Sequence, residues 1–154
     1  MKKDEFCKYC IEAYRPVETL IKLIPADKLD WKPGDNFMTF GELICHLSAG
    51  IGLELKMLID NNWPRHPEGP LPSCNCSEAL AALEKDKSFL REVLSEVTEE
   101  EFAAREAATP WGASGTIEKM GFDFKEHFTN HKMQLFTYLK ILGIPVNTQT
   151  LYVG

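Results

Sequence analysis

The sequence contains no run of basic residues and no long apolar segment. Its formal net charge is −6, so it lacks the basic surface that the phosphates of nucleic acids require. No stretch approaches the ~20 apolar residues of a membrane-spanning helix. The charged start, Met1 to Glu5, is also unlike the apolar core of a signal peptide. We therefore expect a cytoplasmic protein that has neither a nucleic-acid nor a membrane partner.

The sequence contains five cysteines, an odd number, among its 154 residues. A chain of this length can bury a core of its own and needs no disulfide staples. Without a secretion signal, reduced thiols are the expected state. The length also predicts one domain, residues 1–154.

Alternating runs of β-branched residues, internal repeats and low-complexity tracts are all missing as well. Apolar residues instead recur at helical spacing in four segments. Pro16 lies inside the first of these, and predicts either a kink or a later start. Gly143 and Pro145 mark the end of the last. The pattern predicts an all-α four-helix bundle. The expected helices cover 4–24, 39–58 after a Thr39 cap, 77–97 after a Ser77 cap and 116–142 after a Thr116 cap, with a short turn at 98–101 and loops at 25–38, 61–76 and 105–115.

Three histidines fall on the apolar stripes of the predicted helices. His127 and His131 are four residues apart, which places both imidazoles on one helix face. His46 lies on the apolar stripe of the second helix. Buried imidazoles need partners for their nitrogens, and a shared metal ion satisfies one nitrogen of each. The alternative is that each histidine is a core residue bonded to a backbone carbonyl or a carboxylate.

A site with three histidine ligands has one or more open coordination positions, which is typical of catalytic rather than structural metal sites. The spacing His-x-x-x-His lacks the glutamate of the zincin motif His-Glu-x-x-His. Imidazole suits zinc, nickel and iron alike. We expect a divalent ion, zinc or nickel, with iron as the alternative, held by His46, His127 and His131.

Several other polar residues lie near these histidines, and two of them, Asp123 and Gln134, have two alternative roles. Asp123 is either a residue that orients a ligand or acts as a base, or a solvated carboxylate at a helix start. Glu42 is read as the partner of Thr39 in a capping box. Gln134 either belongs to the site or bonds a neighbouring helix. Glu126 and Asn130 also lie close to the histidines in sequence.

The cysteines and tryptophans suggest weaker alternatives. Cys7 and Cys10 form a Cys-x-x-Cys pair, but the redox use of this motif needs a βαβ setting that the sequence does not provide. Cys7 and Cys10 could also form a zinc site with Cys74 and Cys76, but the Cys-x-Cys spacing of the second pair disfavours it. Cys45 is expected to be a packing residue of its helix. We expect Trp31, Trp63 and Trp111 to cover the core or to wall a pocket, and His66 to be exposed.

Three stretches of the sequence together resemble a known family. They are Trp31-Lys-Pro, the segment Thr39-Phe-Gly-Glu-Leu-Ile-Cys-His46-Leu, and the segment from His127-Phe-Thr-Asn-His131 through Gln134 and Tyr138 to Gly143-Ile-Pro145. Their order and spacing resemble the DinB/YfiT-like family, which is described as metal-dependent enzymes. The resemblance runs through nearly the whole chain and is most specific in the second and fourth helices.

The resemblance implies a four-helix bundle with a crossed helix order, often a homodimer. It implies a metal ion on one histidine of the second helix and two of the fourth, which are His46, His127 and His131 here. Relatives include thiol S-transferases that use bacillithiol and mycothiol-dependent isomerases. By that similarity, the ion activates a low-molecular-weight thiol or a water.

Two functions follow as hypotheses. The first is a metal-dependent thiol S-transferase or hydrolase acting on a small molecule. The alternative is a non-catalytic dimer that binds a metal or small ligand in a structural or stress-related role. A third reading, a bundle without metal, requires protein partners for all three histidines.

Overall fold

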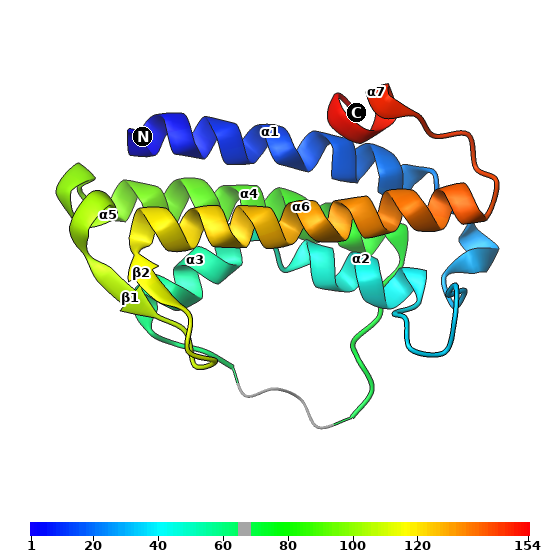
Figure 1. Cartoon of the computed structure of the whole chain (residues 1–154), viewed down its shortest axis with the longest axis horizontal. Coiled ribbons are helices and arrows are strands. Elements are labelled where there is room, and N and C mark those ends of the chain that lie inside the picture. The colour runs from blue at the N-terminus through cyan, green and yellow to red at the C-terminus, as the bar shows by residue number, and fades with distance from the viewer. Residues whose placement is uncertain (65–68) are drawn as a thin grey trace.

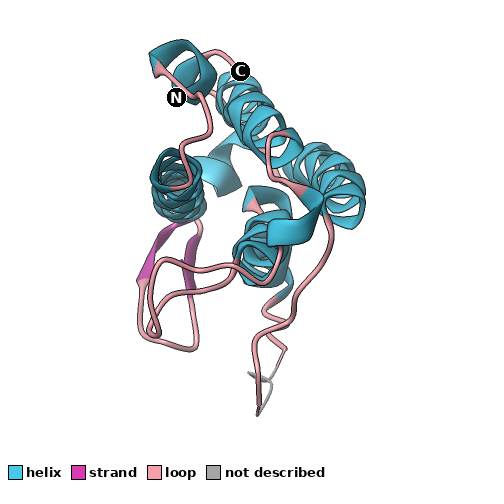
Figure 2. Cartoon of the chain, turned by 90° about the vertical axis from the view of Figure 1, so that its right-hand side faces the viewer, coloured by secondary structure: helices cyan, strands magenta, loops and turns pink. Residues whose placement is uncertain are grey.

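The computed structural model describes residues 1–64 and 69–154. Long helices run side by side along the molecule (Figure 1), and an end-on view shows them around a common centre (Figure 2). The elements are α1 (Lys3–Lys22), the 3-10 helix η1 (Ala26–Lys28), α2 (Phe40–Ser48), α3 (Ile51–Asp60), α4 (Cys76–Glu96), α5 (Glu99–Ala104), β1 (Glu106–Ala108), β2 (Ser114–Thr116), α6 (Ile117–Ile141) and α7 (Thr148–Tyr152).

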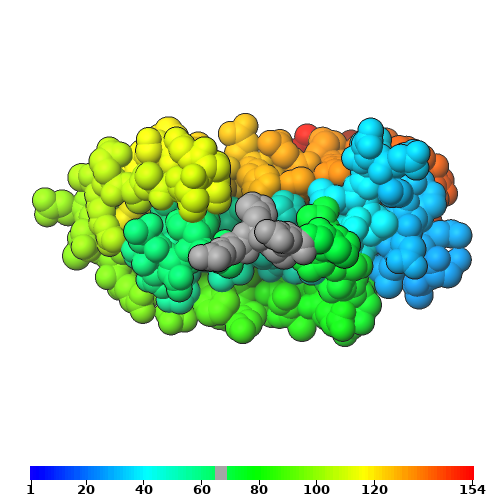
Figure 3. Space-filling model, turned by 90° about the horizontal axis from the view of Figure 1, so that it is seen from below, coloured from blue at the N-terminus to red at the C-terminus, as the bar shows by residue number. Residues whose placement is uncertain are grey.

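The bundle has four members, because α2 and α3 together act as one of them. Helix α1 packs against α4 and α6, and the α2–α3 pair packs against the same two helices from the other side. Helices that follow each other in the chain, α1 and α2–α3 or α4 and α6, therefore stand diagonally. From below, α2 and α3 form a middle band between α6 and α4 (Figure 3). The predicted all-α bundle with a crossed order is confirmed.

The core is built from the apolar stripes that the sequence shows. Each of the four bundle members contributes side chains with no exposed surface, and burying each one stabilises the fold by roughly 1.5–3 kcal/mol. They include Phe6, Tyr14, Leu20, Leu43, Ile44, Ile51, Leu55, Leu83, Leu90, Leu135 and Leu139.

Several helix ends follow the predicted capping chemistry. Thr39 accepts a hydrogen bond from the Glu42 amide, and the Glu42 carboxylate accepts one from the Thr39 amide. Thr116 caps α6 by accepting from the Lys119 amide. Gly143, at φ +76°, follows the end of α6 as expected. Thr39 and Thr116 therefore fix where α2 and α6 begin.

The structure decides one open alternative and corrects three local predictions. The first helix begins at Lys3 with Pro16 inside it, so a later start is excluded. The cap of α4 is Asn75 rather than Ser77, since Asn75 and Glu78 form the capping box. Residues 106–108 and 114–116 form a two-stranded antiparallel hairpin where a loop was expected. Strands of three residues are too short to show an alternating pattern.

The third correction concerns the second helix, which is two helices broken at Ala49 and Gly50. The carboxylate of Asp86 in α4 caps α3 from outside, because it accepts hydrogen bonds from the amides of Gly52, at 3.1 Å, and Leu53, at 2.7 Å. A Cβ at Gly52 would lie 2.2 Å from the Asp86 carbonyl oxygen. Glycine is needed at Gly52 for this close approach of α3 to α4.

Candidate metal centre

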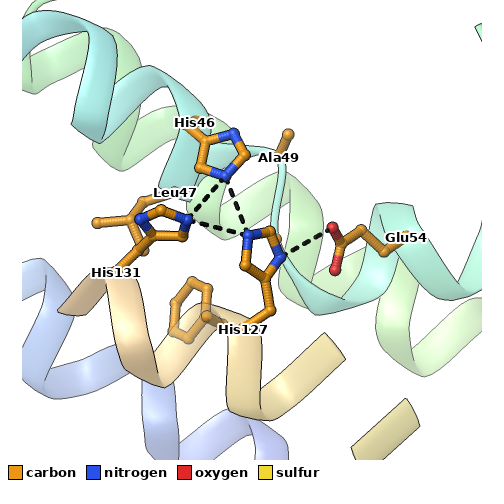
Figure 4. Close-up of a pocket in the computed structure, with 8 residues that line it drawn as sticks. His46, Leu47, Ala49, Glu54, His127 and His131 are labelled. Atoms are coloured by element: carbon orange, nitrogen blue, oxygen red, sulfur yellow. Dashed lines mark hydrogen bonds and ion pairs between the residues drawn. The ribbon is translucent and has the colours of Figure 1, made fainter. Parts of the chain in front are cut away.

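The three predicted ligands meet at one point (Figure 4). His46 lies in the last turn of α2, while His127 and His131 are one turn apart in α6. The Nε2 atom of His46 is 3.2 Å from that of His127 and 3.1 Å from that of His131. The Nε2 atoms of His127 and His131 are 2.9 Å apart. Among the described residues, these three form the one group of three or more His, Cys, Asp or Glu whose ligand atoms converge in this way.

The hydrogen-bond chain on α6 assigns the tautomer of His131. Tyr138 donates its hydroxyl hydrogen to the Met38 carbonyl, which can only accept. The Tyr138 oxygen therefore accepts from the Gln134 amide NH2, and the Gln134 carbonyl oxygen faces Nδ1 of His131 at 2.9 Å. Nδ1 of His131 must donate this bond, so Nε2 of the neutral ring carries a lone pair.

A carboxylate assigns His127 in the same way. Oε1 of Glu54, in the first turn of α3, lies 3.3 Å from Nδ1 of His127. Nδ1 donates to it, and Nε2 again carries the lone pair when the ring is neutral. A carboxylate or carbonyl oxygen on the far nitrogen is the usual outer partner of a metal-binding histidine.

This arrangement fits a divalent cation. With the rings neutral, His127 and His131 point two lone pairs at each other, and a hydrogen on His46 Nε2 can satisfy just one of them. Nitrogen ligands at ~2.0–2.1 Å from an ion are roughly 2.9–3.4 Å apart in octahedral or tetrahedral geometry, which matches the observed separations. A cavity of about 10 Å³ lies between the rings, enough for one small ion or a water.

Electrostatics around the rings differ from one histidine to the next. Burial, with the nearby rings of His131 and His127, lowers the pKa of His46 to about 4. Burial also lowers the pKa of His131. The Glu54 hydrogen bond raises the pKa of His127, while burial raises the pKa of Glu54 itself. Two of the three rings therefore favour the neutral, ligand form at neutral pH.

The expectation that the histidines are buried inside the bundle was wrong. His46 is exposed, and the His127 side chain keeps 43% of its surface accessible. The buried Leu47 and Phe128 lie beneath them and line the inner wall of the small cavity. The apolar stripes place the rings at the edge of the core, where one side of the site remains open to solvent.

Glu54 is the residue of this site that the sequence analysis did not identify. Glu54 is eight residues from His46 in the sequence. Its contact with His127 depends on the break between α2 and α3 and on how α3 packs against α6, and the spacing of residues within one segment does not reveal either. Asp123, which we considered, pairs instead with Lys119 at the surface. Glu42 caps α2 as predicted, while Glu126 and Asn130 are exposed. Gln134 does contact the site, through His131.

The cysteines do not form a second metal centre among the described residues. All five are free thiols. Burial raises the pKa of Cys10 to about 12, and burial together with the neighbouring Cys45 raises that of Cys74 to about 12. Neither is a reactive thiolate at neutral pH.

Trp31 and Trp63 pack against the core, Trp111 is largely exposed, and none of the three lines the small cavity between the histidines. Trp31 packs against Phe40 with tilted rings and edge-on against Tyr138. Trp63 packs edge-on against Trp111, with ring centroids 4.9 Å apart. His66 lies outside the described residues.

Comparison with known proteins places the chain in a family. The sequence model of the DinB superfamily matches residues 11–122. The chain belongs to the DinB superfamily. The matched region contains His46 and Glu54 but ends before His127 and His131, so for these two the assignment as ligands rests on the geometry described above.

One solved structure supports the fold of this DinB-like chain. A DinB-like protein of Bacillus subtilis, YjoA, superposes with a TM-score of 0.70 and 18% sequence identity. The match covers 92% of this chain and 94% of that one. At that identity the likeness shows a common fold. No curated protein matches the sequence. None of the described helices is both long and apolar enough to cross a membrane.

Proposed function

We propose that this DinB-like protein binds one divalent ion on His46, His127 and His131 and acts as a metal-dependent thiol S-transferase or hydrolase. The observation that carries the proposal is the convergence of three Nε2 atoms, two of them held as lone-pair donors by Glu54 and Gln134. We expect zinc or nickel, with iron as the alternative, since imidazole suits all three.

An open coordination position favours catalysis over a structural role. The described residues supply three ligands and no fourth His, Cys, Asp or Glu at the cluster. The carboxylate of Glu54 is engaged on the far side of the His127 ring (Figure 4). When bound, the ion would lower the pKa of an adjacent thiol or water and so supply a nucleophile at neutral pH.

The protein residues have separate parts in this reaction. His46, His127 and His131 provide neutral nitrogen donors, and Glu54 and Gln134 keep two rings in the ligand tautomer. Leu47 and Phe128 exclude water from the inner side of the site, which strengthens electrostatic interactions there. In a transfer, the thiol sulfur bonds to the electrophilic carbon of the substrate. The leaving group departs with its electron pair, and the thiol proton passes to solvent.

The test is turnover with a defined substrate pair. A low-molecular-weight thiol such as bacillithiol and a chlorinated aromatic electrophile are mixed with zinc- or nickel-loaded protein, and thioether formation is followed by absorbance. The proposal predicts turnover that chelation abolishes and that His131→Ala lacks. Equal rates for wild type, His131→Ala and buffer would contradict the transferase, and hydrolysis of activated esters is then the second assay.

We also propose a homodimer, on the resemblance to the DinB family alone. Light scattering on the purified protein measures this directly. A mass of a single chain, 17.5 kDa, at micromolar concentration would contradict it.

A further inference from the structure

A second and much larger cavity adjoins the metal centre. Its volume is about 390 Å³, within the roughly 300–1,000 Å³ typical of small-molecule sites. It lies between α2, the start of α3, α4 and the chain segment before α4. His46 and Ala49 line both this cavity and the small one between the histidine rings. A molecule bound here would therefore reach the open side of His46.

The walls of this cavity are mainly apolar. Met38, Leu53, Leu71, Pro72 and Ala82 line it from four separate segments. The polar groups at its edge are largely engaged within the protein. The Ser48 hydroxyl donates to the Cys45 carbonyl at 2.7 Å, and Oε2 of Glu42 accepts from the Thr39 amide at 2.7 Å. Apolar contact is therefore the main interaction that the cavity offers to a ligand.

The described lining of the cavity carries a negative charge at Glu42, which disfavours an anionic ligand. Among the described residues that line it, Glu42 is the one charged side chain and none is a lysine or an arginine. An anionic ligand would have to approach this carboxylate at short range in a partly desolvated site, which is unfavourable. An uncharged molecule meets no such barrier.

We propose that this cavity binds the uncharged, apolar body of the electrophilic substrate, placing its reacting carbon beside His46. The proposal rests on the proposed function for the reaction, but the binding site itself is defined by the cavity. It assigns the substrate class as uncharged aromatic or aliphatic electrophiles, and it makes Ala82, Leu71 and Glu42 specificity-determining residues.

Two fluorescent probes with the same ring system test the site in metal-free protein. N-phenyl-1-naphthylamine is uncharged, and 8-anilinonaphthalene-1-sulfonate carries an added negative charge. We expect saturable binding of one equivalent of the uncharged probe, and at least about tenfold weaker binding of the sulfonate, equivalent to ~1.4 kcal/mol. Glu42→Gln, which keeps the capping box, is expected to narrow that difference. Equal affinities for both probes in wild type would overturn the charge argument.

Variants on α4 locate the probe. Ala82→Trp fills the cavity and is expected to weaken binding of the uncharged probe at least about tenfold. Ala81→Trp is the matched control, because Ala81 is the exposed neighbour and does not line the cavity. Leu71→Asp, at a side chain that is 53% exposed, adds a second negative charge with little risk to folding. Unchanged affinity for the uncharged probe in both Ala82→Trp and Leu71→Asp would overturn the assignment of its binding site to this cavity.

Competition separates this inference from the proposed function. If both hold, the uncharged probe raises KM for the aromatic electrophile and leaves kcat unchanged. Metal-dependent turnover that the probe does not inhibit would overturn the inference and leave the proposed function standing. Probe binding that Ala82→Trp removes, in a protein that takes up no metal, would support the site and overturn the proposed function.

Discussion

Glu54 and Gln134 do not touch the proposed ion, yet they decide which nitrogen of each ring faces it. Both accept a hydrogen from Nδ1, of His127 and His131 respectively. Without them, each ring could turn its protonated nitrogen toward the centre. At the scale of single residues, the proposed metal centre therefore depends on these acceptors as well as on the three histidines.

Replacing Glu54 with glutamine tests this dependence. The amide is a weaker acceptor than the carboxylate, so we expect zinc affinity to fall about 10–100-fold. Competition with a chromophoric chelator measures the affinity. Glu126→Gln is the matched control, because Glu126 is exposed and next to His127 in α6. Equal zinc affinity in the two variants would contradict the assigned role of Glu54.

The cysteines are expected to behave as poor nucleophiles. Because burial raises the pKa of Cys10 and Cys74 to about 12, their thiolate fraction is small at neutral pH. The thiolate fraction grows as the pH rises toward that pKa. The rate of alkylation should therefore keep increasing at pH values above about 8.5, where an ordinary thiol is already mostly ionised. Iodoacetamide pulses at several pH values, read by mass spectrometry, check this. Rapid labelling of native Cys74 at neutral pH would contradict it.

At this scale the sequence identified much of the site and missed one member. Helical phasing brought His127 and His131 together, because both lie on one helix. The meeting with His46 came from the family resemblance and from the shared apolar stripes. Glu54 could not be found, because its orientation depends on a helix break that is set by a residue in a third helix. The spacing of one segment carries no information on that contact.

The break between α2 and α3 is the main feature at the scale of elements. It places His46 at the end of one helix and Glu54 in the first turn of the next, facing the same stretch of α6. Asp86 holds it, accepting from two amides of α3 and from the hydroxyl of Tyr14. A buried carboxylate is costly unless it is hydrogen-bonded in this way.

Asp86→Ala should therefore be strongly destabilising. It leaves three donors without an acceptor, two of them buried, and we expect the free energy of unfolding to fall by about 3 kcal/mol or more. Asp123→Ala is the control, because its ion pair with Lys119 is exposed and should contribute less than ~1 kcal/mol. Urea unfolding followed by circular dichroism compares them. Similar losses in both variants would contradict the role of Asp86.

Helix existence was predictable from the sequence, and helix boundaries were partly so. Thr39 and Thr116 cap as expected because their side chains act on amides of the same segment. The sequence pattern assigned the cap of α4 to Ser77 instead of Asn75, because asparagine and serine both favour the N-cap position. Only the capping box between Asn75 and Glu78 distinguishes the two candidates. The hairpin at 106–116 is stabilised by six paired residues, too few for any periodicity.

At the scale of the whole molecule, the candidate metal centre joins two neighbouring members of the bundle that are distant in the sequence. His46 comes from α2 and the other two ligands from α6, which pack side by side. A bound ion would therefore crosslink two members of the bundle. The three histidines come together only in the folded chain, so the ion should bind the folded state and stabilise it by mass action.

Thermal unfolding measures this crosslink. Zinc at a hundred times its dissociation constant should add about 2.7 kcal/mol and raise Tm. His46→Ala removes the α2 ligand and should abolish the shift, while Ser48→Ala on the same helix should keep it. A zinc-dependent rise in Tm of the same size in His46→Ala would contradict a centre that spans α2 and α6.

The account depends most directly on the metal content of the protein. Elemental analysis of purified protein, after incubation with zinc or nickel and removal of excess, gives the number of ions per chain. We predict one ion per chain in wild type and in Asn130→Ala, an exposed neighbour on α6, and essentially none in His127→Ala. Equal metal content in wild type and His127→Ala would contradict the central claim.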